Sequence, residues 1–168
     1  MQSLSIIQKW FKDQGWKPFP FQQESWERYL RGESGLLNAP TGSGKTYALW
    51  LACLAKFIEE HPDDWQDPKK SRQNKLRVLW ITPLRALTKD LARAMTEACD
   101  GIGVPWRVAV RTGDTSSAER QKLKKNRPDC LLTTPETLHL LLAQKKYDTT
   151  FQHLDAVIVD EWHELLGS

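Results

Sequence analysis

The chain has 168 residues, 40% of them hydrophobic, which is enough for one α/β domain with a buried core. The formal net charge is only +3, so the chain is no basic arm, and any nucleic-acid surface must be a local patch. Cys53, Cys99 and Cys130 are widely spaced with no CxxC pair, which argues for reduced thiols packed in a core. No apolar run is long enough to span a bilayer and no leader pattern follows Met1, so we expect a cytoplasmic protein without membrane contact.

Two amphipathic helices are predicted in the first thirty residues. Leu4, Ile7 and Phe11 have helical spacing, and Trp26 and Leu30 repeat the pattern after a break that contains glycine and proline. An apolar pair, Leu36 and Leu37, follows and is predicted to be a short strand.

Strands and helices then alternate along the chain. A helical run is predicted at 47–58, and residues 61–75 are polar without periodicity, so they are expected to form an exposed loop. Short apolar strands are predicted at 77–82, 106–111, 130–133 and 154–159, each but the last followed by a helical stretch. This alternation favours a parallel sheet flanked by helices, and we find no internal repeat and no domain boundary.

Residues 39–46, Ala-Pro-Thr-Gly-Ser-Gly-Lys-Thr, have the pattern of a phosphate-binding loop. The glycines leave backbone N–H groups free to wrap a polyphosphate, Lys45 reaches the terminal phosphates, and Thr46 offers a hydroxyl to Mg²⁺ at a helix N-terminus. Ala39 stands where the general pattern has glycine, and a small residue still fits. An ordinary strand-to-helix turn is the alternative, which the flanking apolar and helical runs disfavour. The loop predicts binding of ATP through Thr41, Gly42, Ser43, Gly44, Lys45 and Thr46.

Two adjacent carboxylates follow the last predicted strand. Ligands of open parallel sheets sit at the carboxyl ends of strands, where Asp160 and Glu161 lie. Asp160 would hold Mg²⁺ through water, and Glu161 would polarise the attacking water. An acidic pair after a strand is usually a solvated strand end, but the phosphate loop upstream favours the functional interpretation.

Three further predicted strand ends carry helix-start signals. Residues 82–83 and 134–135 are each Thr-Pro, a capping hydroxyl before a proline suited to the first helical position, and Ser116 with Glu119 has the form of a capping box. In a parallel sheet these helix N-termini share the edge of the phosphate loop and attract anions, so a nucleic-acid backbone is a matching ligand. Arg85, Lys89 and Arg111 would add phosphate contacts, although each cap or cation alone is an ordinary surface feature.

Taken in order, these segments resemble the motifs of a superfamily 2 helicase over nearly the whole chain. The segments are 22–26 with Gly32, 39–46, 82–87, 111–115, 133–136 and 160–163. The Asp-Glu-Trp-His-Glu-Leu ending and Trp10-Phe11 resemble the large helicase-related (Lhr) family, most closely the ligase-associated DEXH-box helicase of bacterial DNA repair. The resemblance implies that residues 1–168 form an incomplete N-terminal RecA-like P-loop NTPase domain, the helicase ATP-binding domain.

The resemblance also implies a role for each matching residue. Gln22 would contact the adenine, Lys45 and Glu161 would act in catalysis, Thr46 and Asp160 would hold Mg²⁺, and His163 would couple the nucleotide site to a partner domain. The residues expected to contact nucleic acid are Thr82, Pro83, Arg85, Arg111, Gly113, Asp114 and Thr134.

In that family the activity is ATP-driven translocation on single-stranded DNA with three-prime-to-five-prime polarity. A DNA ligase or nuclease is a possible partner. Two alternatives stay open: a motor directed to RNA, because backbone contacts barely distinguish the two nucleic acids, and a non-catalytic module that binds only nucleotide or nucleic acid.

The chain ends at Ser168, shortly after the DExH motif, so the resemblance leaves the second RecA-like domain outside it. That domain supplies arginines to the nucleotide, and an arginine finger contributes about 10³–10⁵ in rate. We therefore expect residues 1–168 alone to bind ATP weakly and to hydrolyse it close to background. Family architecture also places a later strand between the strand at 154–159 and the phosphate-loop strand, so we expect unpaired edges on both of these strands and marginal stability in this segment.

Overall fold

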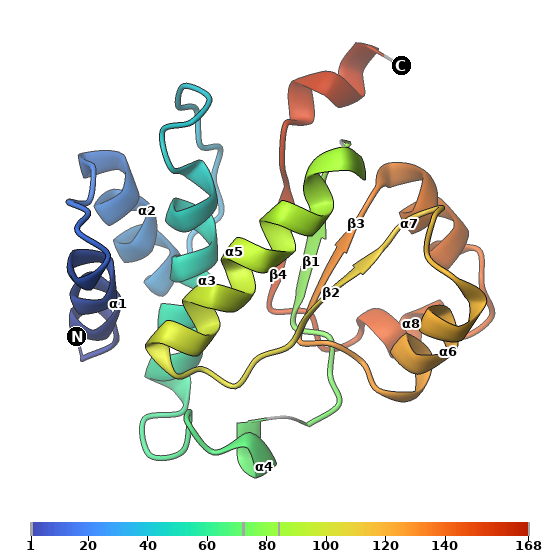
Figure 1. Cartoon of the computed structure of the whole chain (residues 1–168), viewed down its shortest axis with the longest axis horizontal. Helices are drawn as coiled ribbons and strands as arrows, with labels where there is room; N and C mark the ends of the chain where they lie inside the picture. The colour runs from blue at the N-terminus through green and yellow to red at the C-terminus, as the bar shows by residue number, and fades with distance from the viewer. Residues whose placement is uncertain (1, 72, 84, 168) are drawn as a thin grey trace. The chain divides into compact units, whose positions relative to one another are not determined.

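The structure is a computed structural model that describes residues 2–71, 73–83 and 85–167 (Figure 1). These residues form two compact units, where the sequence predicts no boundary. The first unit contains the described residues up to Ser71 together with Ala98–Pro105. The second contains the described residues of 73–97 and 106–167.

The first unit is helical. Its core is formed by the long apolar helix α3, which packs with α1 and α2 and buries Trp50 completely. Ile7 of α1 and Trp26 of α2 are also fully buried, which confirms the two amphipathic helices predicted from their spacing. The helices are α1 Gln2–Asp13, α2 Pro20–Leu30, α3 Lys45–Glu60 and α4 Pro68–Ser71, with the last turn of α5 Thr88–Ile102.

Two predictions for this unit are wrong. Residues 33–40 have no regular structure and Leu36 is 72% exposed, so the strand predicted at Leu36 and Leu37 is not formed. A two-residue apolar run needs a neighbouring strand for its N–H and C=O groups, and the four strands of the structure pair with one another instead. The short helix α4 lies within the predicted loop at 61–75, where the Asp67 carboxylate accepts the Lys69 N–H at 2.9 Å. One helical turn is too short to show hydrophobic periodicity.

The second unit contains a four-stranded sheet of order β2-β3-β1-β4, all parallel (Figure 1). The strands lie within the four predicted segments, so the predicted α/β fold with a parallel sheet is confirmed. They are β1 Val78–Ile81, β2 Val108–Arg111, β3 Cys130–Thr133 and β4 Ala156–Val159. The other elements are 3-10 helix η1 Arg85–Leu87, the first turns of α5, α6 Ser117–Lys125, α7 Pro135–Leu142, α8 Tyr147–Phe151 and 3-10 helix η2 Trp162–Gly167.

Both faces of the central strands are buried. On one face Leu79 and Leu131 form a core cluster with Leu141 of α7, and Phe151 of α8 packs against it. On the other face Trp80 and the neighbouring residues of β1 and β3 are fully buried. Of the two expected unpaired edges, the one at β4 is found, because β4 pairs with β1 alone among the described strands and its Val157 and Val159 are 55% and 44% exposed. The other was expected on the strand at Leu36 and Leu37, which is not formed.

In the part of the chain that the structure describes, none of the helices combines the length and the apolar character needed to cross a membrane.

Candidate nucleotide and nucleic-acid site

The phosphate loop of the first unit requires its glycines. Gly42 and Gly44 have φ angles of 77° and 86°, the left-handed region in which a side chain is strained. Ser43 donates its N–H to the Pro40 carbonyl at 3.2 Å, which closes a turn, and α3 begins directly afterwards at Lys45. The predicted passage from a Gly-rich turn into a helix N-terminus is therefore confirmed, and the N–H groups of this terminus are suited to an anion.

Gln22 holds this loop from α2. Its side-chain Nε2 donates to the Gly44 carbonyl at 3.0 Å, and its Oε1 accepts the Phe19 N–H at 2.8 Å. The side chain is 1% exposed, so the residue expected to contact adenine is here buried between two backbone groups. A Cβ at position 44 would lie 2.5 Å from Gln22 Nε2, so a side chain there would displace the Gln22 amide from its contact with the loop. The adenine contact stays a prediction.

The start of α3 is braced by aromatic side chains of the same unit. Trp26, four residues after Gln22 on α2, donates its indole N–H to the Tyr47 carbonyl at 3.1 Å. The Tyr47 ring packs against Trp16 and Trp10, with centroid distances of 5.2 Å and 5.9 Å. The N-terminal helices therefore fix the first turn of α3, which carries Lys45 and Thr46.

We predict that Gln22→Ala destabilises the first unit and lowers nucleotide affinity. The change leaves the Phe19 N–H without its acceptor and removes one donor from the Gly44 carbonyl, and removal of a buried hydrogen-bond partner costs about 1–3 kcal/mol. Chemical denaturation and ATP titration measure the two effects. The control is Gln23→Ala, an exposed neighbour on the same helix, which should change neither. Equal stabilities of the two variants would contradict the bracing role.

The carboxylates lie in the second unit, at the end of β4. Asp160 donates its N–H to the Ile81 carbonyl at 2.8 Å, which fixes the backbone beside β1. Glu161 has a φ of 48°, an unfavourable left-handed angle for this residue type, and its N–H is held by Asp160 Oδ1 at 3.0 Å. Glu161 Oε2 lies 3.3 Å from His163 Nε2, so two residues with predicted roles are in direct contact.

The strand register places the predicted residues of this unit at one edge. Ile81 is level with Thr133 and Val159, and Thr133 is level with Arg111. The residues after these strand ends therefore form a row along the carboxyl edge. In sheet order they are Thr112, Thr134, Thr82 and Asp160.

Two of the three predicted helix caps differ in the structure. Thr134 is the N-cap of α7, but its hydroxyl is fully buried and donates to Thr137 Oγ1 at 3.2 Å instead of capping the helix. Pro83 does not begin a helix, because η1 intervenes and α5 starts only at Thr88. The Thr-Pro pattern indicates where the strand ends but does not determine where the side chain points. The third cap is confirmed, since Ser116 Oγ accepts the Glu119 N–H and Glu119 accepts the Ser116 N–H.

Arg85 of η1 and Arg111, the last residue of β2, form a basic patch beside the loop that follows β2. Arg85 Nη1 lies 3.7 Å from Asp114 Oδ1, and its guanidinium lies over Gly113, where a Cβ would be 3.0 Å from Nη2. Burial, with the nearby charge of Arg120, lowers the pKa of Arg111, which nevertheless stays cationic at neutral pH. Three predicted nucleic-acid residues are thus brought together: Arg85, Gly113 and Asp114.

Arg120 was not predicted from the sequence. It donates to the Thr115 carbonyl at 2.9 Å and to the Gly113 carbonyl at 3.3 Å, so it shapes the loop that contacts Arg85. Its position in a run of basic helix residues gives no signal that separates it from solvated lysines.

Comparison with known proteins identifies the class to which this fold and site belong. Residues 19–168 match the DEAD/DEAH box helicase family, and the chain belongs to that family. The superfamily and the RecA-like fold expected from the sequence are therefore confirmed.

The relatives indicate the group within the family. The chain is 37% identical over 169 residues to the Lhr helicase/uracil glycosylase of Escherichia coli, an alignment that covers 95% of this chain and 11% of that protein. It is 36% identical over 169 residues to ATP-dependent helicase Lhr-Core protein 2 of Thermococcus barophilus, covering 95% of this chain and 19% of the relative. The solved structure of Mycobacterium smegmatis helicase Lhr bound to ssDNA and AMP-PNP matches with a TM-score of 0.75 and 33% identity, over 95% of this chain and 20% of that one. The predicted resemblance to the Lhr family is confirmed, and the chain spans only about a tenth to a fifth of these curated relatives.

Proposed function

We propose that residues 1–168 are the N-terminal ATP-binding motor domain of an ATP-dependent DNA helicase of the Lhr type. The observation that carries this proposal is the loop of Gly42 and Gly44 leading directly into α3, in a chain that belongs to the DEAD/DEAH box helicase family. The loop would bind the ATP phosphates through its N–H groups and Lys45.

The residues present are suited to a magnesium nucleotide. Mg²⁺ prefers oxygen ligands, and Thr46 and Asp160 each offer one on a partly exposed side chain. When bound, the metal neutralises charge on the phosphates. Glu161 would orient the attacking water. His163, which contacts Glu161, would couple the nucleotide site to a partner domain.

The nucleic-acid strand would lie along the carboxyl edge of the sheet. Support comes from Arg85, whose guanidinium lies over Gly113, from the cationic Arg111 at the end of β2 and from the capped N-terminus of α6. We propose single-stranded DNA as the substrate because the similar Lhr structure is bound to ssDNA. The buried hydroxyl of Thr134 leaves backbone groups as the contact at that strand end.

The wider setting follows the resemblance. A second RecA-like domain would complete the nucleotide site, and the group expected from the sequence, the ligase-associated DEXH-box helicases, would place the protein in DNA repair beside a ligase or nuclease. A cytoplasmic location is compatible with Cys53, Cys99 and Cys130, all of which are buried thiols.

The experiment that tests this function is strand separation by the full-length protein. We expect ATP-dependent displacement of a strand from a DNA duplex with a single-stranded tail, together with ATP hydrolysis stimulated by single-stranded DNA. Matched RNA substrates, compared at several salt concentrations, distinguish a DNA motor from an RNA motor. Nucleotide binding without stimulated hydrolysis would instead support the non-catalytic module.

A further inference from the structure

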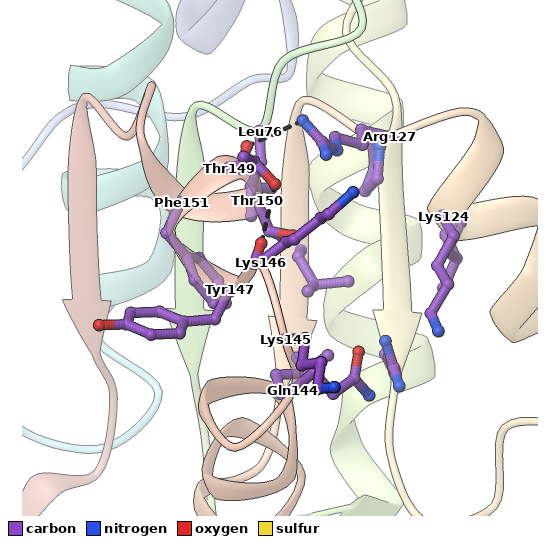
Figure 2. A pocket seen from close by; sticks show the side chains of 15 residues that line it. Leu76, Lys124, Arg127, Gln144, Lys145, Lys146, Tyr147, Thr149, Thr150 and Phe151 are labelled. Atoms are coloured by element: carbon purple, nitrogen blue, oxygen red, sulfur yellow. Dashed lines mark hydrogen bonds between the residues drawn. The ribbon is translucent and has the colours of Figure 1, made fainter.

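We propose that the second unit has an additional binding site for a phosphate group of the nucleic-acid strand, in a basic cavity on the sheet face next to α6, α7 and α8. The proposal rests on the proposed function, because it extends the path of the same strand beyond the carboxyl edge. The cavity has a volume of about 260 Å³ (Figure 2).

Cationic side chains surround this cavity. Five of its lining residues are basic, and no Asp or Glu lines it among the residues that the structure describes. Figure 2 shows Lys146 extending across the cavity toward the side where Arg127 and Lys124 lie. The five basic residues are Arg111, Lys124, Arg127, Lys145 and Lys146. Like charges gathered around one cavity repel each other, and a bound anion removes that repulsion.

Hydrogen bonds hold Arg127, one of these basic residues, in place. Arg127 donates its Nη1 to the Thr149 carbonyl at 2.9 Å, and its N–H is held by Asn74 Oδ1 at 2.6 Å. Lys146 has a φ of 68°, a left-handed angle at which glycine would be favourable, yet the position carries a lysine that lines the cavity. Residues held in such conformations often serve a function, because the fold alone does not favour them.

The size and the floor of the cavity indicate the ligand. Small-molecule sites are roughly 300–1,000 Å³, so this smaller cavity fits one phosphate-bearing unit of a chain better than a whole nucleoside triphosphate. Its floor is apolar, formed by core residues such as Leu131, Leu141 and Phe151, against which a sugar or base can lie. A cationic rim over an apolar floor is the combination that single-strand binders use.

Arg111 connects the cavity to the nucleic-acid edge. It ends β2, directly before the loop of Gly113 and Asp114, and it also lines the cavity. A strand that passes over the basic patch can therefore continue onto this face without leaving positive charge. This continuity favours a backbone phosphate over a free anion as the ligand.

The test is salt-titrated binding of single-stranded DNA to the full-length protein. We expect Lys124→Gln, and the double change Lys145→Gln with Lys146→Gln, to weaken binding and to reduce the salt slope by about 0.7 for each phosphate that is no longer neutralised. The matched control is Lys125→Gln, the neighbouring lysine on α6, which carries the same charge and does not line the cavity. Lys146→Gly should raise the melting temperature by relieving the left-handed angle while still weakening binding.

The outcomes separate this inference from the proposed function. If Arg85→Gln weakens binding but the cavity variants behave like Lys125→Gln, the cavity site alone is overturned. If the parent protein binds no single strand, both proposals are overturned. If the cavity variants lose binding of inorganic phosphate but keep the parent affinity for DNA, the cavity takes a free anion and the nucleic-acid assignment is wrong.

Discussion

Lys45→Ala in the full-length protein is expected to lose most of its ATP affinity while the fold is kept. Hydrogen bonds to charged groups contribute about 1.5–3 kcal/mol, so loss of the ammonium that meets the terminal phosphates should weaken binding roughly 10–150-fold. The fold should survive because Lys45 is only partly buried at the first position of α3, where alanine is a good helix former. Calorimetric titration with ATP measures the affinity, and a thermal melt checks the fold.

The matched control for this variant is Lys17→Ala. Lys17 is exposed in the same unit, between α1 and α2 and away from residues 39–46 in sequence. Because it is also a lysine, its replacement by alanine changes the charge by the same amount. We expect its ATP affinity to equal that of the parent protein. If Lys45→Ala binds ATP with the same affinity as the parent protein, the assignment of residues 39–46 as a phosphate-binding loop is wrong.

The sheet could be predicted from the sequence because each of its strands is a short apolar run with clear limits. The run Val78–Ile81 is completely buried and lies between Cys130–Thr133 and Ala156–Val159, so hydrophobicity alone locates it. The parallel direction follows from the helices between the strands. The order of the strands does not follow in the same way, because strand order depends on crossovers that leave no local pattern.

Side-chain contacts were less predictable than the backbone. The Thr134 hydroxyl has a capping partner within reach in sequence, yet it donates to Thr137 in the protein interior. Gln22 matches a nucleotide-contact motif, but its amide also binds the Gly44 carbonyl, a contact across 22 positions of sequence. Local pattern gives the residue type that a position requires, and tertiary packing decides which of its possible partners it meets.

The strand predicted at Leu36 and Leu37, which is not formed, shows that an apolar run alone does not predict a strand. Apolar residues indicate that a segment can be a strand, but a strand also needs a neighbour to pair its backbone groups. Among the described strands, β4 pairs on one side only, and its Val157 and Val159 are exposed. Pairing partners are a property of the whole fold, which a short run of residues cannot specify.

Glu161 in the DExH motif has a left-handed backbone angle, a feature that the sequence alone does not show. A φ of 48° costs a residue of this type on the order of 1–3 kcal/mol, and the Asp160 carboxylate and the Glu164 N–H, which donates to the Glu161 carbonyl at 2.9 Å, hold it in place. A solvated strand end has no reason to keep such strain. The angle therefore supports the interpretation of Glu161 as a catalytic residue.

Glu161→Gln in the full-length protein is expected to stop ATP turnover while ATP binding is kept. Glutamine has the same size and the same backbone preference, so stability should not change, but it cannot accept a proton from the attacking water. General-base catalysis contributes about 10²–10⁴-fold, so kcat should fall by at least 10²-fold. Affinity for ATP should stay equal or rise, because the change removes a negative charge proposed to lie near the phosphates. Steady-state hydrolysis with single-stranded DNA and a nucleotide titration measure the two effects.

The matched control for this prediction is Glu164→Gln. Glu164 also faces His163, with its Oε1 3.5 Å from the same Nε2 that lies 3.3 Å from Glu161. Glu164→Gln therefore removes an equal charge and an equivalent histidine contact, but from a residue with no proposed part in the chemistry. We expect it to keep kcat near that of the parent protein. If both variants lose turnover equally, the defect comes from the pairing with His163, and Glu161 is not the base.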